Sequence, residues 1–130
     1  MTNLVERGEK MEDCKLYDAE YRLMDLVWQL EPVNSTALAK RCAELFGWNK
    51  STAFNLIRKL SGRGFLRNEQ ATVTTLVGRE DVMRYESRAV VEKSFGGSLP
   101  AFVAAFLNGR KLTGEETEQL RKMIEEAGDE

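Results

Sequence analysis

The chain has 130 residues, with 19 Lys plus Arg against 21 Asp plus Glu, two cysteines and no histidine. This length suits one domain, or a small domain with an extension. Without histidine the chain lacks the commonest general base and the commonest metal ligand, so we predict no enzyme, no metal site and no cofactor. No apolar run approaches the roughly 18 residues that span a bilayer, and the polar start has no signal-peptide core. We therefore expect a cytoplasmic protein with no membrane partner, in which Cys14 and Cys42 are free thiols.

The net charge of −2 hides an uneven distribution. Residues 1–33 carry 4 basic and 8 acidic side chains, residues 34–80 carry 8 and 3, and residues 81–130 carry 7 and 10. The centre of the chain therefore has a charge of +5 between two acidic flanks. An excess of this size fits either an ordinary solvated surface or a nucleic-acid contact, and the patterns of the predicted helices have to decide.

Residues 1–15 are polar and unpatterned, which predicts a flexible N-terminal tail. An amphipathic helix follows, with Asp18 as its N-cap and an end at Glu31-Pro32. Its apolar face is formed by Leu23, Leu26, Val27 and Leu30. A second, short helix begins at the capping residues Asn34-Ser35-Thr36 and stops at Gly47. A third helix covers residues 49–63 and has Asn49 as its N-cap.

The sequence then changes from helical to strand composition. The β-branched stretch 71–77 follows Phe65-Leu66-Arg67, and Asn68-Glu69-Gln70 between them predicts a tight turn and a short β-hairpin. Three helices followed by a hairpin within about 60 residues is the order of a winged helix-turn-helix. We predict a mainly α fold with a small β-hairpin wing, in which residues 16–78 form a winged-helix domain and residues 79–130 a helical domain.

The C-terminal region has three further helical segments with many apolar positions. The first runs from Arg79 to Phe95, the second includes residues 99–107, and the third begins at the capping sequence Thr113-Gly114-Glu115-Glu116. Helices this apolar outside the first core need a partner. The apolar positions that it would cover are Phe95, Leu99, Phe102, Val103, Phe106, Leu120, Met123 and Ile124.

The third helix separates a core face from a polar face. Short hydroxyl and amide side chains on the polar face are typical of a helix that enters the major groove, where Asn can pair with adenine and Thr can contact a thymine methyl. The groups placed to contact the DNA backbone are Asn49, Lys50, Ser51, Arg58, Lys59, Arg63 and, on the hairpin, Arg67. Phe54, at the edge of the polar face, is either an apolar base contact or part of the junction with the first helix.

An ordered set of motifs resembles the penicillinase repressor family, the BlaI and MecI type. It includes residues 17–28, Trp48-Asn49-Lys50-Ser51-Thr52, residues 56–60, Gly64-Phe65-Leu66, residues 76–80 and Gly96-Gly97, and the resemblance covers about residues 16–127. It implies a homodimeric winged-helix repressor whose third helix enters the major groove of a palindromic operator in double-stranded DNA. It also implies that the last helices form the dimer, and the apolar positions listed above for these helices are then the predicted dimer interface.

The resemblance also implies which residues read the bases. The family's base-reading positions fall on Thr52, Phe54 and Asn55. Phe54 departs from the family, which usually has Lys or Arg there, so the operator is expected to differ from the family's usual sequence. The hairpin turn is shorter and less basic than is common in the family, which predicts weaker contacts of the wing to the DNA backbone.

Release of DNA in this family commonly follows proteolytic cleavage inside the dimer-forming helices, triggered by a membrane sensor of β-lactams. The aligned bond here is Ala105–Phe106, where the family members known to be cut have Asn before Phe. A sensor or protease is therefore a candidate partner. The family's copper-responsive branch has a C-terminal cysteine cluster, which residues 125–130 lack, so we expect no metal sensing by that route.

Two other functions remain compatible with the sequence. A winged-helix module that binds protein would use the polar face of the third helix as plain surface, and its function would survive changing Asn55 and Arg58 to Ala. A regulator that responds to a small molecule would use the apolar helices from Val90 to Leu107 to line a pocket.

Overall fold

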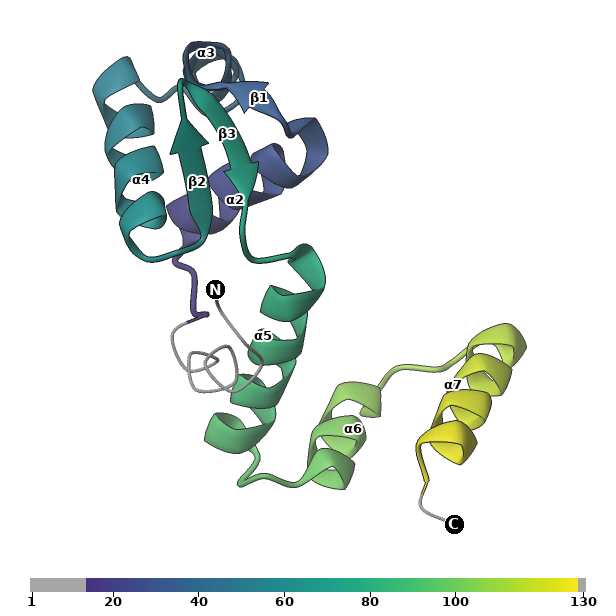
Figure 1. The fold of residues 1–130 in the computed structure, drawn as a ribbon. Helices are drawn as coiled ribbons and strands as arrows, with labels where there is room; N and C mark the ends of the chain where they lie inside the picture. The colour runs from purple at the N-terminus through teal and green to yellow at the C-terminus, as the bar shows by residue number, and fades with distance from the viewer. Residues whose placement is uncertain (1–13, 129–130) are drawn as a thin grey trace. The chain divides into compact units, whose positions relative to one another are not determined.

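The computed structural model describes residues 14–128. The elements, with the labels of Figure 1, are α2 (Asp18–Leu30), β1 (Val33–Asn34), α3 (Ser35–Phe46), α4 (Lys50–Gly62), β2 (Leu66–Glu69), β3 (Thr72–Thr75), α5 (Arg79–Ser94), α6 (Leu99–Leu107) and α7 (Gly114–Ala127). This order of helices and wing confirms the predicted fold class. Residues 1–13 of the predicted tail lie outside the described residues, and Cys14, next to them, is buried.

Side chains just before the helices fix where most of them begin. Asn34 Oδ1 accepts hydrogen bonds from the backbone N–H groups of Thr36 and Ala37, and Asn49 Oδ1 accepts one from Thr52. Thr113 and Glu116 form the reciprocal pair of a capping box. These caps confirm the helix starts predicted at those positions.

The predicted cap of α2 is wrong. Tyr17 occupies the N-cap position, and its backbone N–H donates to Glu20 Oε1 at 2.9 Å. Asp18 is instead the first helical residue, where its negative charge meets the positive end of the helix dipole. An acidic residue at the start of a helix is favourable in either position, so its identity alone does not locate the cap.

The three strands form an antiparallel sheet in the order β1-β3-β2. Leu66 pairs with Thr75 and Glu69 with Thr72, so Asn68 and Glu69 belong to the strand and not to the predicted turn. The turn consists of Gln70 and Ala71, with φ values of 51° and 63°. Two central residues with positive φ form a type I′ turn, whose twist matches that of the flanking strands.

The core of the winged-helix unit lies between its helices and the sheet. In Figure 1, α2 passes behind the sheet and α4 runs beside β2. The core side chains include Leu23, Val27, Leu38, Cys42, Ala53, Ile57, Leu60 and Val73. Burial raises the pKa of the Cys42 thiol to about 11, which keeps it protonated at neutral pH. Leu30, predicted on the apolar face, is the last residue of α2 and is 37% exposed.

The chain divides into two compact units, residues 1–89 and residues 90–130, so the division lies inside α5. Val82, near the start of α5, is fully buried in the first core, and for this reason the first part of the helix belongs to the winged-helix unit. In the second unit, α6 and α7 have no buried residue at all. No single described helix is long and apolar enough to cross a membrane, and α5 with α6 meets that test only as a pair bent by 91°.

Candidate nucleic-acid interface

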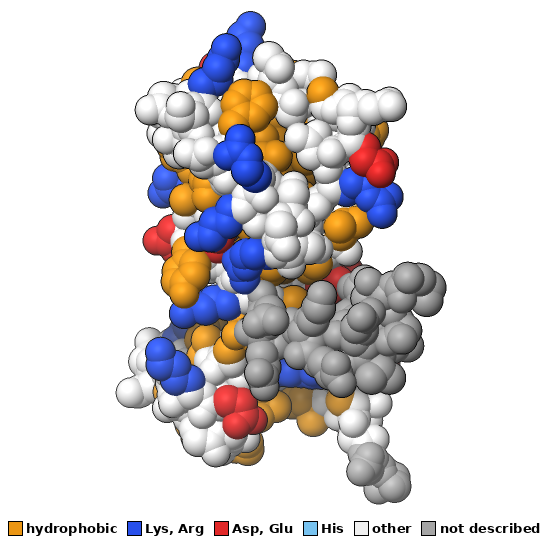
Figure 2. Space-filling view, turned by 60° about the vertical axis from the view of Figure 1, so that its left-hand side comes forward, with side chains coloured by type: hydrophobic (Ala, Val, Ile, Leu, Met, Phe, Trp, Pro, Cys, Tyr) orange, Lys and Arg blue, Asp and Glu red, His pale blue; other side chains and the backbone are white. Residues whose placement is uncertain are grey.

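α4 has a core face and a polar face. The buried core face fixes the helix against the sheet, so the polar face points outward. Ala53, Ile57 and Leu60 are buried, whereas Thr52, Asn55 and Arg58 are exposed. Figure 2 shows the side of the molecule that carries α4, where Lys and Arg side chains gather with hydrophobic side chains between them. The sequence-predicted base-reading positions are therefore on one accessible helix, with Phe54 partly buried at the edge.

Two of the polar side chains on this face form a hydrogen bond with each other. Arg58 Nη1 donates to Asn55 Oδ1 at 2.9 Å, one turn apart along the helix. This bond orients the Asn55 amide and leaves its NH₂ group and a second lone pair on Oδ1 for a base edge. The arrangement suits the bidentate contact of Asn with adenine that the sequence predicts.

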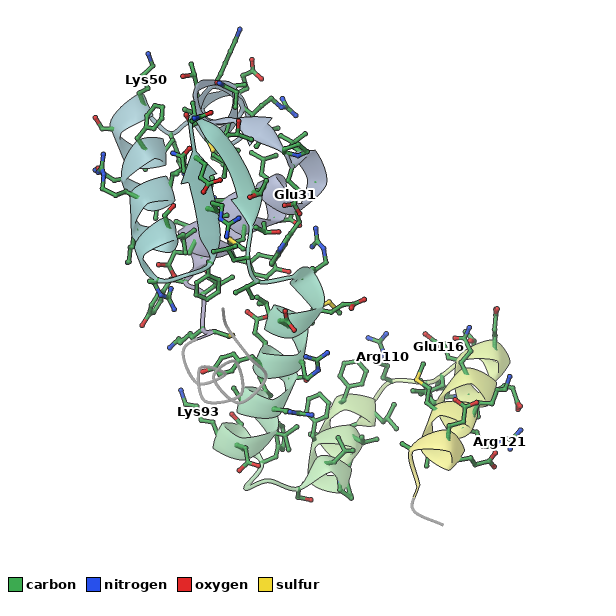
Figure 3. All side chains as sticks on the ribbon, in the orientation of Figure 1. Glu31, Lys50, Lys93, Arg110, Glu116 and Arg121 are labelled. Carbon is green, nitrogen blue, oxygen red and sulfur yellow. The ribbon has the colours of Figure 1, made fainter. Side chains whose placement is uncertain are left out.

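Lys50 is the first residue of α4, at the N-terminal end of the helix. Its side chain points away from the body of the winged-helix unit, as Figure 3 shows. Lys50, Arg58 and Arg67 make no ion pair within residues 14–128 and are exposed. These three cations are therefore available to an external anion.

Lys59 and Arg63, also predicted as DNA-backbone contacts, have an internal partner. Arg63 Nη1 lies 3.0 Å from Glu20 Oε1, and Lys59 Nζ lies 3.3 Å from Glu20 Oε2. Arg63 also donates to the Lys15 carbonyl at 2.7 Å and lies over the ring of Phe65. Lys59 keeps 58% of its side chain exposed, but Arg63 keeps only 27%. Arg63 is thus mostly engaged by contacts within the protein, and little of its side chain is left for a phosphate.

Glu20 is a site residue that sequence reasoning missed. Its side chain is 2% exposed, in the first turn of α2. Burial alone would raise its pKa, but the Tyr17 N–H, Lys59 and Arg63 outweigh that effect and lower the pKa below its ordinary value of 4.5. The resulting carboxylate joins α2 to the C-terminal half of α4, which fixes how the polar face is presented. An acidic residue in a first helical turn gives no sequence signal for such a role.

The wing is fixed to α2 at its base. The Thr75 backbone N–H and hydroxyl donate to the Glu31 carboxylate, which Figure 3 labels beside β3. The Trp28 indole N–H donates to the Val77 carbonyl at 3.0 Å. On the strands, Arg67 and Glu69 both lie at exposed positions with the same side-chain alternation, so the wing carries one cation and one anion on its outer face.

The predicted dimer residues are mostly exposed in the single chain. Phe95, Phe102 and Phe106 form a row of rings with centroids 5.4 and 6.2 Å apart. Phe106 is nevertheless 55% exposed, Met123 61% and Ile124 69%. Leu99, Val103 and Leu120 are exposed as well. The Ala105–Phe106 bond lies within α6, with both residues accessible.

Within residues 14–128, no three Cys, Asp or Glu side chains come together in a way that would hold a metal ion. An open depression lies at Leu16, Asp18, Tyr21, Arg22 and Glu86, in the winged-helix unit and outside the segment from Val90 to Leu107. Apart from Glu69 on the wing and Phe54 at the edge of α4, the groups that these two elements present are hydroxyls, amides and cations, which suit the binding of a polyanion.

Comparison with known proteins identifies the family of this chain over nearly its whole length. The family model described as "Penicillinase repressor" matches residues 16–126. The chain is 23% identical over 116 residues to the penicillinase repressor of Bacillus licheniformis, covering 86% of this chain and 91% of that protein. It is 24% identical over 119 residues to the methicillin resistance regulatory protein MecI of Staphylococcus aureus strain N315, covering 86% and 97% of the two chains. The chain therefore belongs to the penicillinase repressor family, whose members are DNA-binding transcriptional repressors and not enzymes.

Proposed function

We propose that this repressor binds a palindromic operator in double-stranded DNA as a homodimer, with α4 in the major groove and the wing against the adjacent backbone. The observation that carries the proposal is the outward face of α4. It combines exposed Thr52 and the oriented pair Asn55–Arg58 with a free cation, Lys50, at the helix N-terminus. The N-terminal half of such a helix is the part that meets base edges in helix-turn-helix proteins.

The charges divide into contacts with DNA and contacts within the protein. Lys50, Arg58 and Arg67 are the proposed phosphate contacts, together with Asn49, Ser51 and the exposed Lys59. Because Glu20 neutralises Lys59 and Arg63 in part, the protein has fewer free cations at the groove than its composition implies. Each neutralised phosphate adds nearly one unit to the salt dependence of binding, so we expect a modest slope that reflects a few contacts.

The proposed dimer would cover the apolar side chains of the second unit. α6 is a nine-residue helix of apolar residues, and it buries none of them within its own chain. Monomeric soluble proteins rarely expose so many large apolar side chains in one small region. A second copy of the chain would bury them and would also double the DNA contacts, because two half-sites are then engaged together.

Selection of bound duplexes from a random pool, with a mass measurement of the complex, tests this proposal. We expect one palindromic sequence and a complex of two chains with one duplex. In the same assay Asn55→Ala should lose preference at one base pair per half-site, whereas Lys50→Ala should weaken all sequences alike. An enriched pool without symmetry, or a complex with one chain, would contradict the homodimer. No enrichment at all would contradict sequence-specific binding.

We propose that release, if it is proteolytic as the family resemblance implies, occurs at Ala105–Phe106. Because the bond lies inside α6, the helix has to unwind locally before a protease can hold it in an extended form. Cleavage there would separate the apolar part of α6 from α7 and so remove half of the proposed dimer surface. Mass analysis of the fragments formed by the inactivating protease checks the position of the cut.

A further inference from the structure

Phe54 lies at the edge of the α4 face proposed to contact DNA, on the side of the helix away from its contacts with Glu20 of α2. At 100° per residue, Phe54 is about 140° from Lys59 and about 180° from Arg63 around the axis of α4, and these two side chains point to Glu20 of α2. Lys50 and Arg58 precede and follow Phe54 by one turn, each about 40° away. Both are exposed cations without an acidic partner in the described chain. The ring therefore sits in a basic stripe, in the half of the helix nearer its N-terminus.

The surroundings of Phe54 differ from those of every other phenylalanine in the described chain. Phe46 packs on Trp48, Phe65 lies under Arg63, and the three phenylalanines of the second unit contact one another. Phe54 has neither a ring partner nor a cation over its face within residues 14–128, although Lys50 and Arg58 are one turn away. The side chain packs against the core cluster, which holds it in place. Phe54 is partly buried, so only part of the residue is accessible to a ligand.

A phenyl ring has no hydrogen-bond donor or acceptor, which limits what it can recognise. The base edges in the major groove present donors and acceptors for every base pair, and the only apolar group among them is the C5 methyl of thymine. A phosphate or a polar base edge placed against the ring would lose its water without gaining a hydrogen bond. The ring therefore favours a thymine methyl and disfavours the other base edges.

We propose that Phe54 reads the methyl group of one thymine in each half-site of the operator. This inference depends on the proposed entry of α4 into the major groove. The hydrogen-bonded pair Asn55–Arg58 next to Phe54 then supplies polar contacts to a neighbouring base pair, so an adenine or guanine contact and a thymine contact fall side by side. Where the family usually has Lys or Arg at this position, this chain selects a base by its methyl group.

Removing single methyl groups from the DNA tests the inference with the protein unchanged. The selected operator is synthesised with deoxyuridine in place of one thymidine at a time, which deletes the methyl and preserves the pairing. At fixed salt, we expect one thymine per half-site whose replacement weakens binding about fourfold, the effect of removing one buried methyl-sized group from an apolar contact. Replacement of the other thymines should weaken binding less. The exception is a thymine adjacent to Thr52, because a threonine side chain can also contact a thymine methyl.

Variants at position 54 connect that effect to the ring. Phe54→Ala should bind more weakly but should no longer distinguish uridine from thymidine at the sensitive position. Phe54→Lys, whose aliphatic stem retains packing, should change the selected base there from T to G, because Lys donates to guanine O6 and N7. Lys50→Ala is the matched control, and it should lower the affinity for both duplexes equally. Circular dichroism confirms that each variant is folded.

Failure of the proposed function and failure of the proposed role of Phe54 give different results. If the wild-type protein enriches no sequence, the proposed function is wrong and this inference with it. If an operator is enriched but no uridine substitution weakens binding, or if Phe54→Ala and Phe54→Lys keep the wild-type sensitivity, only the role of Phe54 is wrong. If the only thymine whose replacement by uridine weakens binding is one adjacent to Thr52, the methyl contact belongs to Thr52 and the inference is overturned.

Discussion

At the scale of single residues, Glu20 connects stability to the presentation of α4. Its carboxylate is buried and accepts from Tyr17 and Arg63, with Lys59 at 3.3 Å. Glu20→Gln removes the charge and keeps the shape, so it should lower the free energy of unfolding by about 2 kcal/mol at neutral pH, the range for hydrogen bonds to charged groups. Urea unfolding followed by tryptophan fluorescence measures this change, because Trp28 and Trp48 both lie in the winged-helix unit. Glu44→Gln is the control, since its pair with Arg41 is about half exposed and should contribute under 1 kcal/mol.

The same residue sets an expected pH dependence. The pKa of Glu20 is lower in the folded protein than its ordinary value of 4.5. The unfolded chain therefore binds the proton more readily, and the stability that Glu20 contributes is complete above pH 4.5 and declines as the pH falls below it. The difference between the wild-type protein and Glu20→Gln should shrink over that acidic range. A difference that stays constant there would contradict the charged role of Glu20.

The residues that the sequence predicted well are those that act locally. Asn49 caps the helix that begins at the next residue, so its role can be deduced from neighbouring residues alone. Arg63 and Glu20, in contrast, are 43 residues apart in the chain. Before the packing of α2 on α4 is known, Glu20 is only one of several acidic residues at helix starts. The same limit applies to Arg63, which the sequence presented as one more cation near the polar face.

At the scale of elements, the wing has a turn that its residues fit poorly. Gln70 and Ala71 both have positive φ, which costs an L-residue with a side chain about 1 kcal/mol or more. Ala71→Gly relieves that strain and should raise the free energy of unfolding by roughly 0.5 to 1 kcal/mol, after the greater entropy of glycine in the unfolded chain is subtracted. Ala43→Gly, at an exposed position inside α3, is the matched control and should have the opposite sign, a loss of about 1 kcal/mol. Urea unfolding of both variants at one protein concentration makes the comparison, and two changes of the same sign would contradict the strained turn.

The wing also shows which elements a sequence pattern can locate. β3 was predicted because residues 71–77 are rich in β-branched side chains, but β1 has only two residues, Val33 and Asn34, too few for any pattern. Those residues form a strand because Val33 pairs with Val73, so the element exists only with its partner in place. The turn was displaced by two residues for a similar reason. Asn68 and Glu69 have turn-like composition, but their pairing with Val73 and Thr72 extends the strand.

At the scale of the whole molecule, the two units differ in how they stabilise themselves. The winged-helix unit has a closed core with fully buried side chains from α2, α3, α4 and β3. The second unit has helices with well-formed caps, at Ser98 and Thr113, but no buried residue in α6 or α7. Caps fix where helices begin and contribute about 1 kcal/mol each, which does not hold short helices together in water. The stability of the second unit should therefore depend on association and on protein concentration.

Phe106→Ala tests this dependence directly. Phe106 stacks on Phe102 and has Arg110 over its ring, yet more than half of its surface is exposed in the single chain, so the rest is available to a second copy. Aromatic side chains at the centre of an interface typically contribute 2 kcal/mol or more, so the variant should raise the dimer dissociation constant by about thirtyfold or more. Sedimentation over a concentration series measures that constant. Leu45→Ala is the control, because Leu45 is 51% exposed on α3 of the winged-helix unit and should leave association unchanged. If the wild-type protein sediments as a monomer at micromolar concentration, or if Phe106→Ala associates as tightly as the wild type, α6 is not the dimer surface and another partner must cover it.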